Sequence, residues 1–299
     1  MSVLHHLDTS LTSNASQVNR RQSLALLAAF CAGSVAAQEE LDDLAKIRSK
    51  GMLKVAVYKD NAPFSSGHNS DMTGLDIALA QALAQKLQLK PTLLPFDAGE
   101  NMNDDLRNMV WRGHYLGYGP ADVMLHVPVD KYLSQQNRQV VIFAPYMRQI
   151  PVLLRDVKAM PQFSEPQDLK PFKLAAERGT GTAGALIGQN SGALSGQVVL
   201  FNSGMEAARA VFHGQVQAAY ILQSQAEAAM AQNKRDPANY PITPMSLPGL
   251  PDNGWPIGMA VKTSFKDLGQ ALQAAMKELR ESGELLAMFK ERGMTLTAP

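Results

Sequence analysis

The sequence predicts an α/β protein with two lobes, on three observations. Short apolar strands alternate with amphipathic helices from residue 53 to residue 125, which favours a parallel sheet with right-handed crossovers. The alternation pauses at two extended apolar runs, 140–143 and 150–154, and resumes at residue 173. A helical hairpin is left over after the second set of strands, and its simplest packing returns it to the first set.

Length and composition narrow the class of protein. The chain has 299 residues, 45% hydrophobic and 18% charged, which describes a globular protein of about two domains. A net charge of +1 gives no electrostatic footprint for nucleic acid. A single cysteine excludes disulfide scaffolds and cysteine-based zinc sites. No segment reaches the roughly 20 apolar residues of a transmembrane helix.

The N-terminal segment has the order of a secretory signal peptide. The arginine pair 20–21 precedes an apolar run, 24–31, and small residues follow as far as the residue before Gln38. We expect cleavage there, so that residues 1–37 are removed and a cysteine-free mature chain lies in the periplasm. The arginine pair resembles a twin-arginine signal, and the sequence leaves that route and ordinary secretion both open.

Each predicted element of the first lobe has a local pattern. Leu75, Leu79, Leu83 and Leu87 recur every four residues, which is one face of a helix. Proline and glycine clusters bound the strands. In chain order the elements are a strand at 53–57, a helix at 75–87, a strand at 91–95, a helix at 103–111 and a strand at 122–125.

The rest of the chain repeats the alternation. Ser203 with Glu206 is a capping-box pattern that predicts a helix start, and Gly283 predicts a helix end. The expected elements are strands at 173–176, 198–200, 218–222 and 257–261, and helices after the turn 180–182, after 203, and at 225–231, 268–279 and 285–289.

The chain is expected to pass between the lobes twice. We assign 38–147 with 255–299 to the first lobe and 148–254 to the second, with crossings near 146–150 and 248–256. Two crossings form a hinge, and a hinge beside a cleft can trap a ligand. The sequence therefore predicts a ligand site between the lobes.

Eight short sequence segments follow one another along residues 50–295. They are Leu53-Lys54-Val55-Ala56-Val57, Ala62-Pro63-Phe64-Ser65, Gly74-Leu75-Asp76-Ile77, Ala121-Asp122-Val123-Met124, Phe143-Ala144-Pro145-Tyr146, Gly179-Thr180-Gly181-Thr182, Gly214-Gln215-Val216-Gln217-Ala218 and Gly283-Glu284-Leu285. This series resembles the periplasmic solute-binding proteins of family 3, the amino-acid-binding group of the type II periplasmic binding proteins. The resemblance implies a two-lobe fold that captures a small molecule, with an ABC permease as a partner.

Two positions depart from that family. After the third strand the family has a Thr-x-x-Arg setting that holds the ligand carboxylate, but this chain reads Val127 to Tyr132 without an arginine. The family's amine-binding Asp is replaced by Leu222 and Gln223. Because a buried charge without a partner is costly, we predict that the ligand is not a standard α-amino acid.

A second resemblance keeps the function open. The chain resembles the accessory binding proteins found with quinoprotein (PQQ) alcohol dehydrogenases at Arg107-Asn108, Asp122-Val123-Met124 and Val127-Pro128. Those accessory proteins also lack the arginine and the aspartate that hold an amino acid. Three hypotheses follow: a binding protein that feeds an importer, an accessory protein of a periplasmic PQQ dehydrogenase, and a dehydratase-like enzyme on the same scaffold.

The candidate ligand-binding residues follow strands or open helices, where parallel sheets bind ligands. The Thr-Gly-Thr turn at 180–182 offers hydroxyl and N–H groups to a polar oxygen. Asp76 is expected near the cleft in a structural role, capping helix N–H groups. The predicted ligand contacts are Tyr58, Asn61, Phe64, His126, Thr180, Gly181, Thr182, Gln223 and Trp255.

Catalytic and metal patterns are missing from the mature sequence. Its histidines, His68, His114, His126 and His213, lack metal-ligand spacing. We find no Gly-x-Ser-x-Gly elbow and no P-loop. We therefore expect no enzymatic activity, no metal and no cofactor, and a monomer whose partner is a small molecule.

Overall fold

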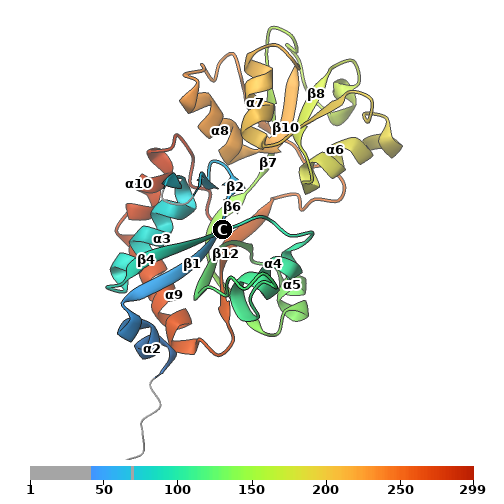
Figure 1. Cartoon of the computed structure of the whole chain (residues 1–299). Helices are drawn as coiled ribbons and strands as arrows, with labels where there is room; N and C mark the ends of the chain where they lie inside the picture. The colour runs from blue at the N-terminus through green and yellow to red at the C-terminus, as the bar shows by residue number, and fades with distance from the viewer. Residues whose placement is uncertain (1–41, 69–70) are drawn as a thin grey trace, which may run out of the picture. The chain divides into compact units, whose positions relative to one another are not determined.

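The computed structural model describes residues 42–68 and 71–299 (Figure 1). The predicted signal peptide, 1–37, and its cleavage site lie outside the described residues. None of the described helices has the length and apolar character needed to cross a membrane.

The first sheet has five strands in the order β4-β1-β5-β12-β6. Its strands are β1 (Met52–Tyr58), β4 (Lys90–Phe96), β5 (Val123–Pro128), β6 (Val140–Gln149) and β12 (Trp255–Lys262). β4, β1 and β5 are parallel as predicted, but β12 runs antiparallel to both β5 and β6. The two prolines of β4 are tolerated because β4 is an edge strand, where a missing N–H breaks no ladder.

The second sheet has five strands in the order β11-β7-β10-β8-β9. Its strands are β7 (Pro151–Arg155), β8 (Leu174–Glu177), β9 (Val198–Phe201), β10 (Ala218–Leu222) and β11 (Ile242–Pro244). The chain passes from the first sheet to the second at Ile150 and returns between β11 and β12. The two-residue strands β2 (Asp60–Asn61) and β3 (Ser65–Ser66) form a separate hairpin.

Helices cover both faces of each sheet. Val55 and Val57 of β1 face the cluster that contains α3, whereas Ala56 between them faces the cluster of α4, as strand alternation requires. In Figure 1, α3 and α9 lie on one side of the first sheet and α4 and α5 on the other. The helices are α2 (Asp43–Lys50), α3 (Leu75–Lys86), α4 (Met102–Leu106) with a π-helical turn (Arg107–Trp111), α5 (Lys131–Gln136), α6 (Gly181–Gly192), α7 (Gly204–Phe212), α8 (Gln223–Gln232), α9 (Lys266–Glu281) and α10 (Glu284–Lys290).

Sequence patterns located the long helices and missed two short ones. α5 has no buried residue, so it carries no apolar period, and it begins where Asp130 accepts the Leu133 N–H at 2.7 Å. α2 buries two residues, which is too few to show a helical period of apolar residues in the sequence. α7 begins at the predicted cap, where Ser203 accepts the Glu206 N–H. The Glu206 carboxylate accepts from Asn202 in place of Ser203, so the cap is not reciprocal.

The C-terminal part of the chain contacts elements that belong to both sheets or pack on them. α9 and α10 pack near α3, where Lys86 forms ion pairs with Glu278 and Glu284. Beyond α10, the Thr295 N–H donates to Glu227 of α8 at 2.7 Å. The Arg148 N–H of β6 donates to the Thr297 carbonyl at 3.0 Å. The C-terminal segment is therefore a further link beside the two strand crossings.

Two irregularities interrupt the strands at the centre of the first sheet. On β5, one extra residue separates the pairs that Gly258 and Ala260 make, and His126 has φ 63°. On β6, two extra residues separate the pairs of Ile257 and Met259. Bulges of this kind re-aim side chains beside functional sites. Here they turn two residues, His126 and Tyr146, toward α3.

Gly258 makes these bulges possible. A Cβ at this position would overlap the Phe143 carbonyl oxygen and press on Val129. The residue is central in β12, between both irregular strands. The close approach of β6 to β12 therefore depends on the absence of a side chain at Gly258.

We predict that Gly258→Ala lowers the free energy of unfolding by about 2–3 kcal/mol, because the backbone of β6 must move away. Urea denaturation measures the loss. Gly269→Ala in α9 is the matched control, because its Cβ meets only the Val261 side chain at 3.5 Å, and helix propensity makes it neutral or stabilising. Equal stability of the two variants would contradict the role of Gly258.

Candidate functional site

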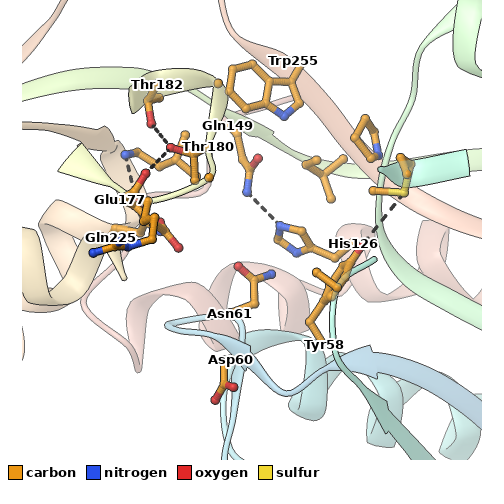
Figure 2. A pocket seen from close by; sticks show the side chains of 18 of the residues that line it. Tyr58, Asp60, Asn61, His126, Gln149, Glu177, Thr180, Thr182, Gln225 and Trp255 are labelled. Carbon is orange, nitrogen blue, oxygen red and sulfur yellow. Dashed lines mark hydrogen bonds between the residues drawn. The ribbon is translucent and has the colours of Figure 1, made fainter. Parts of the chain in front are cut away.

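A cavity of about 580 Å³ lies between the two sheets (Figure 2). β1, β5, β8 and β10 all end at it, so the carboxyl ends of parallel strands from both sheets converge there. Its lining residues are Tyr58, Lys59, Asp60, Asn61, Asp97, Ala98, Met102, His126, Pro128, Gln149, Glu177, Arg178, Gly179, Thr180, Gly181, Thr182, Leu222, Gln225, Trp255 and Ile257.

A buried carboxylate anchors the wall formed by the first sheet. Asp76 is 1% exposed; one of its oxygens accepts a hydrogen bond from the Tyr146 hydroxyl at 2.8 Å, and the other lies 2.9 Å from His126 Nδ1. The His126 backbone N–H donates to the Tyr146 oxygen at 3.1 Å, which closes the circuit. Burial and the nearby Asp76 charge raise the pKa of Tyr146 well above its usual value, so this hydroxyl stays a donor.

The imidazole of His126 uses both nitrogens inside the protein. Its Nε2 lies 2.8 Å from Nε2 of Gln149, the last residue of β6. Phe64 packs on the ring at 4.4 Å between centroids. His126 therefore lines the cavity with its orientation fixed from three sides.

The local sequence explains how Asp76 reaches this position. α3 begins after Gly74, whose φ is 130°, and a Cβ there would overlap the Phe64 carbonyl. The Asp76 N–H donates to that carbonyl at 2.8 Å. Because backbone oxygen satisfies the helix start, the carboxylate does not cap it. The expected capping role of Asp76 is wrong, since its carboxylate binds Tyr146 and His126.

The wall formed by the second sheet has a second buried network. The Glu177 carboxylate accepts the Gly204 N–H at 3.0 Å and the Gln225 amide at 2.7 Å. Burial raises the pKa of Glu177, against the lowering effect of those two hydrogen bonds. Thr180 caps α6 by accepting the Ala183 N–H at 3.2 Å, and its hydroxyl lies 2.8 Å from that of Thr182. The start of α6 thus faces the cavity.

The remaining charged groups lie at the rim. Lys59 and Asp97 form an ion pair at 2.8 Å. Asp60 and Arg178 are exposed, and their side chains make no hydrogen bond or ion pair within residues 42–68 and 71–299. The two positions at which the sequence departs from the amino-acid-binding pattern present Pro128 and Leu222 to the cavity.

Structure comparison identifies the architecture, whereas no family model and no curated protein matches the sequence. An ancestral cationic amino acid solute binding protein (AncCDT-1) superposes with a TM-score of 0.64 at 20% identity, over 84% of this chain and 99% of that one. An amino acid ABC transporter substrate-binding protein from Streptococcus pneumoniae, bound to L-arginine, gives 0.61 at 21% identity, over 86% and 100%. The chain has the two-lobe fold of the type II periplasmic binding proteins.

Another structure of AncCDT-1, described as a precursor of cyclohexadienyl dehydratase, gives a TM-score of 0.58 at 19% identity, over 84% of this chain and 99% of that one. These identities establish the fold alone.

Within this two-lobe fold, most of the predicted ligand contacts meet at one cavity, although ligand contact itself stays a prediction. The predicted residues that line it are Tyr58, Asn61, His126, Thr180, Gly181, Thr182 and Trp255. Phe64 and Gln223 are not among the lining residues.

These two residues are displaced for different reasons. Phe64 is 0% exposed, because it fills the space behind the imidazole of His126. Gln223 starts α8 and donates along the helix to Glu227 at 2.7 Å. Leu222 and Gln225 take its place at the cavity, because the Gln225 side chain folds back to accept the Leu222 N–H.

Several cavity residues were missed from the sequence. Glu177 ends β8 and follows the same strand-end rule that selected Tyr58, so the sequence contained its signal. Gln149 had no such signal, because β6 was expected to stop near Phe143 and in fact continues past Pro145. The charged rim residues had no distinguishing pattern, because Asp97 and Arg178 lie in short loops and Asp60 lies in the two-residue strand β2.

We predict that Tyr146→Phe lowers the free energy of unfolding by about 2–4 kcal/mol, because Asp76 loses a donor and the His126 N–H loses its acceptor. Chemical denaturation at pH 7 measures this loss. Tyr220→Phe is the control, because that buried hydroxyl makes a single hydrogen bond, to the Met245 carbonyl, and costs about 1 kcal/mol. A Tyr146 effect no larger than the control would argue against the circuit.

We predict that Glu177→Gln becomes increasingly stabilising as pH rises. A raised pKa in the folded state means that ionising Glu177 opposes folding, an effect absent below the unfolded value near 4.5 and complete above the folded value. The difference in unfolding free energy between variant and wild type, measured at a series of pH values, should therefore increase from pH 4 to pH 8. A flat or falling difference contradicts the desolvation of this carboxyl.

Proposed function

We propose that the chain is a solute-binding protein that captures a small polar molecule between its lobes, and that this molecule is not a standard α-amino acid. The observation that carries the proposal is the cavity of about 580 Å³ to which both sheets contribute strand ends. That volume lies within the range of small-molecule sites, and capture between hinged halves is the motion two crossings allow. The lobes would be 38–147 with 255–299, and 148–254.

The charges of the cavity argue against an amino acid. A zwitterion needs a desolvated cation and a desolvated carboxylate at fixed positions. Pro128 and Leu222 stand where the amino-acid-binding pattern would supply them. Asp60 and Arg178 carry suitable charges, but both are exposed, and solvent-exposed ion pairs contribute little.

The hydrogen bonds of His126 favour binding over catalysis. Each ring nitrogen already has a protein partner, Asp76 or Gln149, so neither is available to move a proton of the solute. Among the described residues, no second histidine lines the cavity. The dehydratase-like alternative would need one of these bonds to open.

The proposed setting is the periplasm, with the permease of an ABC transporter as the partner. The structural neighbours include substrate-binding proteins of amino acid ABC transporters, which supports this setting. The alternative partner, a periplasmic PQQ dehydrogenase, is distinguished by copurification from the native cell envelope.

A thermal-shift screen tests the proposed function. Purified protein is titrated with amino acids, small organic acids, alcohols and PQQ. A ligand at 100 times its Kd stabilises the folded state by about 2.7 kcal/mol. We expect non-amino-acid solutes to raise the melting temperature and the standard amino acids to leave it unchanged.

Two variants locate the binding. Ala98→Trp fills the cavity from an exposed loop position, and should abolish the shift. Ala238→Trp, exposed and outside the cavity, should preserve it. A strong shift with glutamine or arginine contradicts the exclusion of amino acids, and a shift that survives Ala98→Trp contradicts the assigned site.

A further inference from the structure

Gln149 is a buried polar residue with one half of its amide unused. It is 6% exposed and lines the cavity at the end of β6. Its Nε2 is engaged with His126, whereas its Oε1 makes no hydrogen bond within the described part of the chain. Figure 2 shows the amide nitrogen directed at the imidazole and the oxygen directed away from it.

The proton on the imidazole decides which way this amide faces. Asp76 carries acceptors for His126 Nδ1, so the Nδ1 proton is required there. In a neutral imidazole, Nε2 then carries only a lone pair. Gln149 can meet a lone pair only with its NH₂ group, and its carbonyl oxygen must face the cavity.

The surroundings hold this tautomer in place. Tyr146 occupies the second oxygen of Asp76, so the carboxylate cannot rotate without losing a hydrogen bond. The Tyr146 oxygen in turn accepts the backbone N–H of His126, and Phe64 covers one ring face. The direction of the Gln149 carbonyl is thus set by buried residues that the solute never touches.

We infer that the carbonyl oxygen of Gln149 is a specificity-determining acceptor, and that the solute is a hydroxyl-bearing molecule whose O–H donates to it. This inference rests on the proposed function and assigns the chemical class of the ligand. A solute with only acceptors at this point leaves the carbonyl buried without a partner, which is the situation that gives polar sites their strongest discrimination.

A hydroxyl fits this point better than an ammonium group. A buried ammonium needs a carboxylate beside it, but Asp76 lies behind His126 with both oxygens occupied. Leu222, which is apolar, lines the cavity near the start of α8. A neutral donor requires no charge partner.

The first experiment reads the tautomer without any ligand. Long-range ¹H–¹⁵N NMR of the ¹⁵N-labelled protein at pH 8 reports which imidazole nitrogens of His126 are protonated, with His126→Phe to assign the signals. We expect Nδ1 protonated and Nε2 unprotonated. A proton on Nε2, alone or together with Nδ1, turns the amide of Gln149 around and overturns the inference.

The second experiment compares solutes that differ in one donor. The probes are lactate with pyruvate, 2-hydroxyglutarate with 2-oxoglutarate, and 2-propanol with acetone, each titrated to 100 mM by calorimetry. We expect at least one hydroxyl member to bind, and to bind at least tenfold more tightly than its keto partner. Equal or reversed affinity, or no binding by every hydroxyl member, overturns the inference.

Two matched glutamine variants show whether the preference for a hydroxyl depends on the Gln149 carbonyl oxygen or on a general effect of replacing a glutamine. Gln149→Leu should remove the tenfold preference, and its melting temperature without ligand shows whether it folds. Gln223→Leu makes the same change outside the cavity, where the side chain binds Glu227, and should retain the preference. A preference that persists in Gln149→Leu contradicts the assignment. The broader thermal-shift screen decides the proposed function separately, since a solute without a hydroxyl can satisfy that screen.

Discussion

A buried carboxylate with two hydrogen-bond partners is the constraint on which the cavity between the two sheets depends. Asp76 is almost inaccessible, and burying a carboxylate is tolerable only if its oxygens are hydrogen-bonded. Its partners come from β5 and β6, which lie 50 and 70 residues further along the chain. The same hydrogen bonds that satisfy the carboxylate therefore fix two strands of the first sheet against α3.

The irregular strands follow from this requirement. A regular β5 would alternate its side chains across the sheet, and a regular β6 would pair every backbone group with β12. The bulges bring His126 and Tyr146 to the same side, at the cost of a left-handed residue in each strand, His126 and Ala144. Gly258 makes room for the displaced backbone. Strand geometry, glycine placement and cavity chemistry are thus one arrangement.

The fold was predictable from the sequence because its signals are local. Apolar runs, leucine spacing and the 180–182 turn each identify an element without reference to the rest of the chain, and strand ends identified most of the cavity residues that were predicted. The partners of Asp76 were not predictable, because a bulge depends on a residue in the neighbouring strand. Gln149 was missed for the same reason, and Gln223 was chosen where Leu222 and Gln225 reach the cavity.

The most direct measurement is the position of the protons themselves. Neutron diffraction from a crystal of the deuterium-exchanged protein would show every exchangeable site in the circuit of Asp76, Tyr146, His126 and Gln149. The account predicts deuterium on the Tyr146 oxygen, on His126 Nδ1 and on the Gln149 nitrogen that faces His126, and none on His126 Nε2 or on Asp76. Deuterium on His126 Nε2, or on the Asp76 carboxyl, would contradict it.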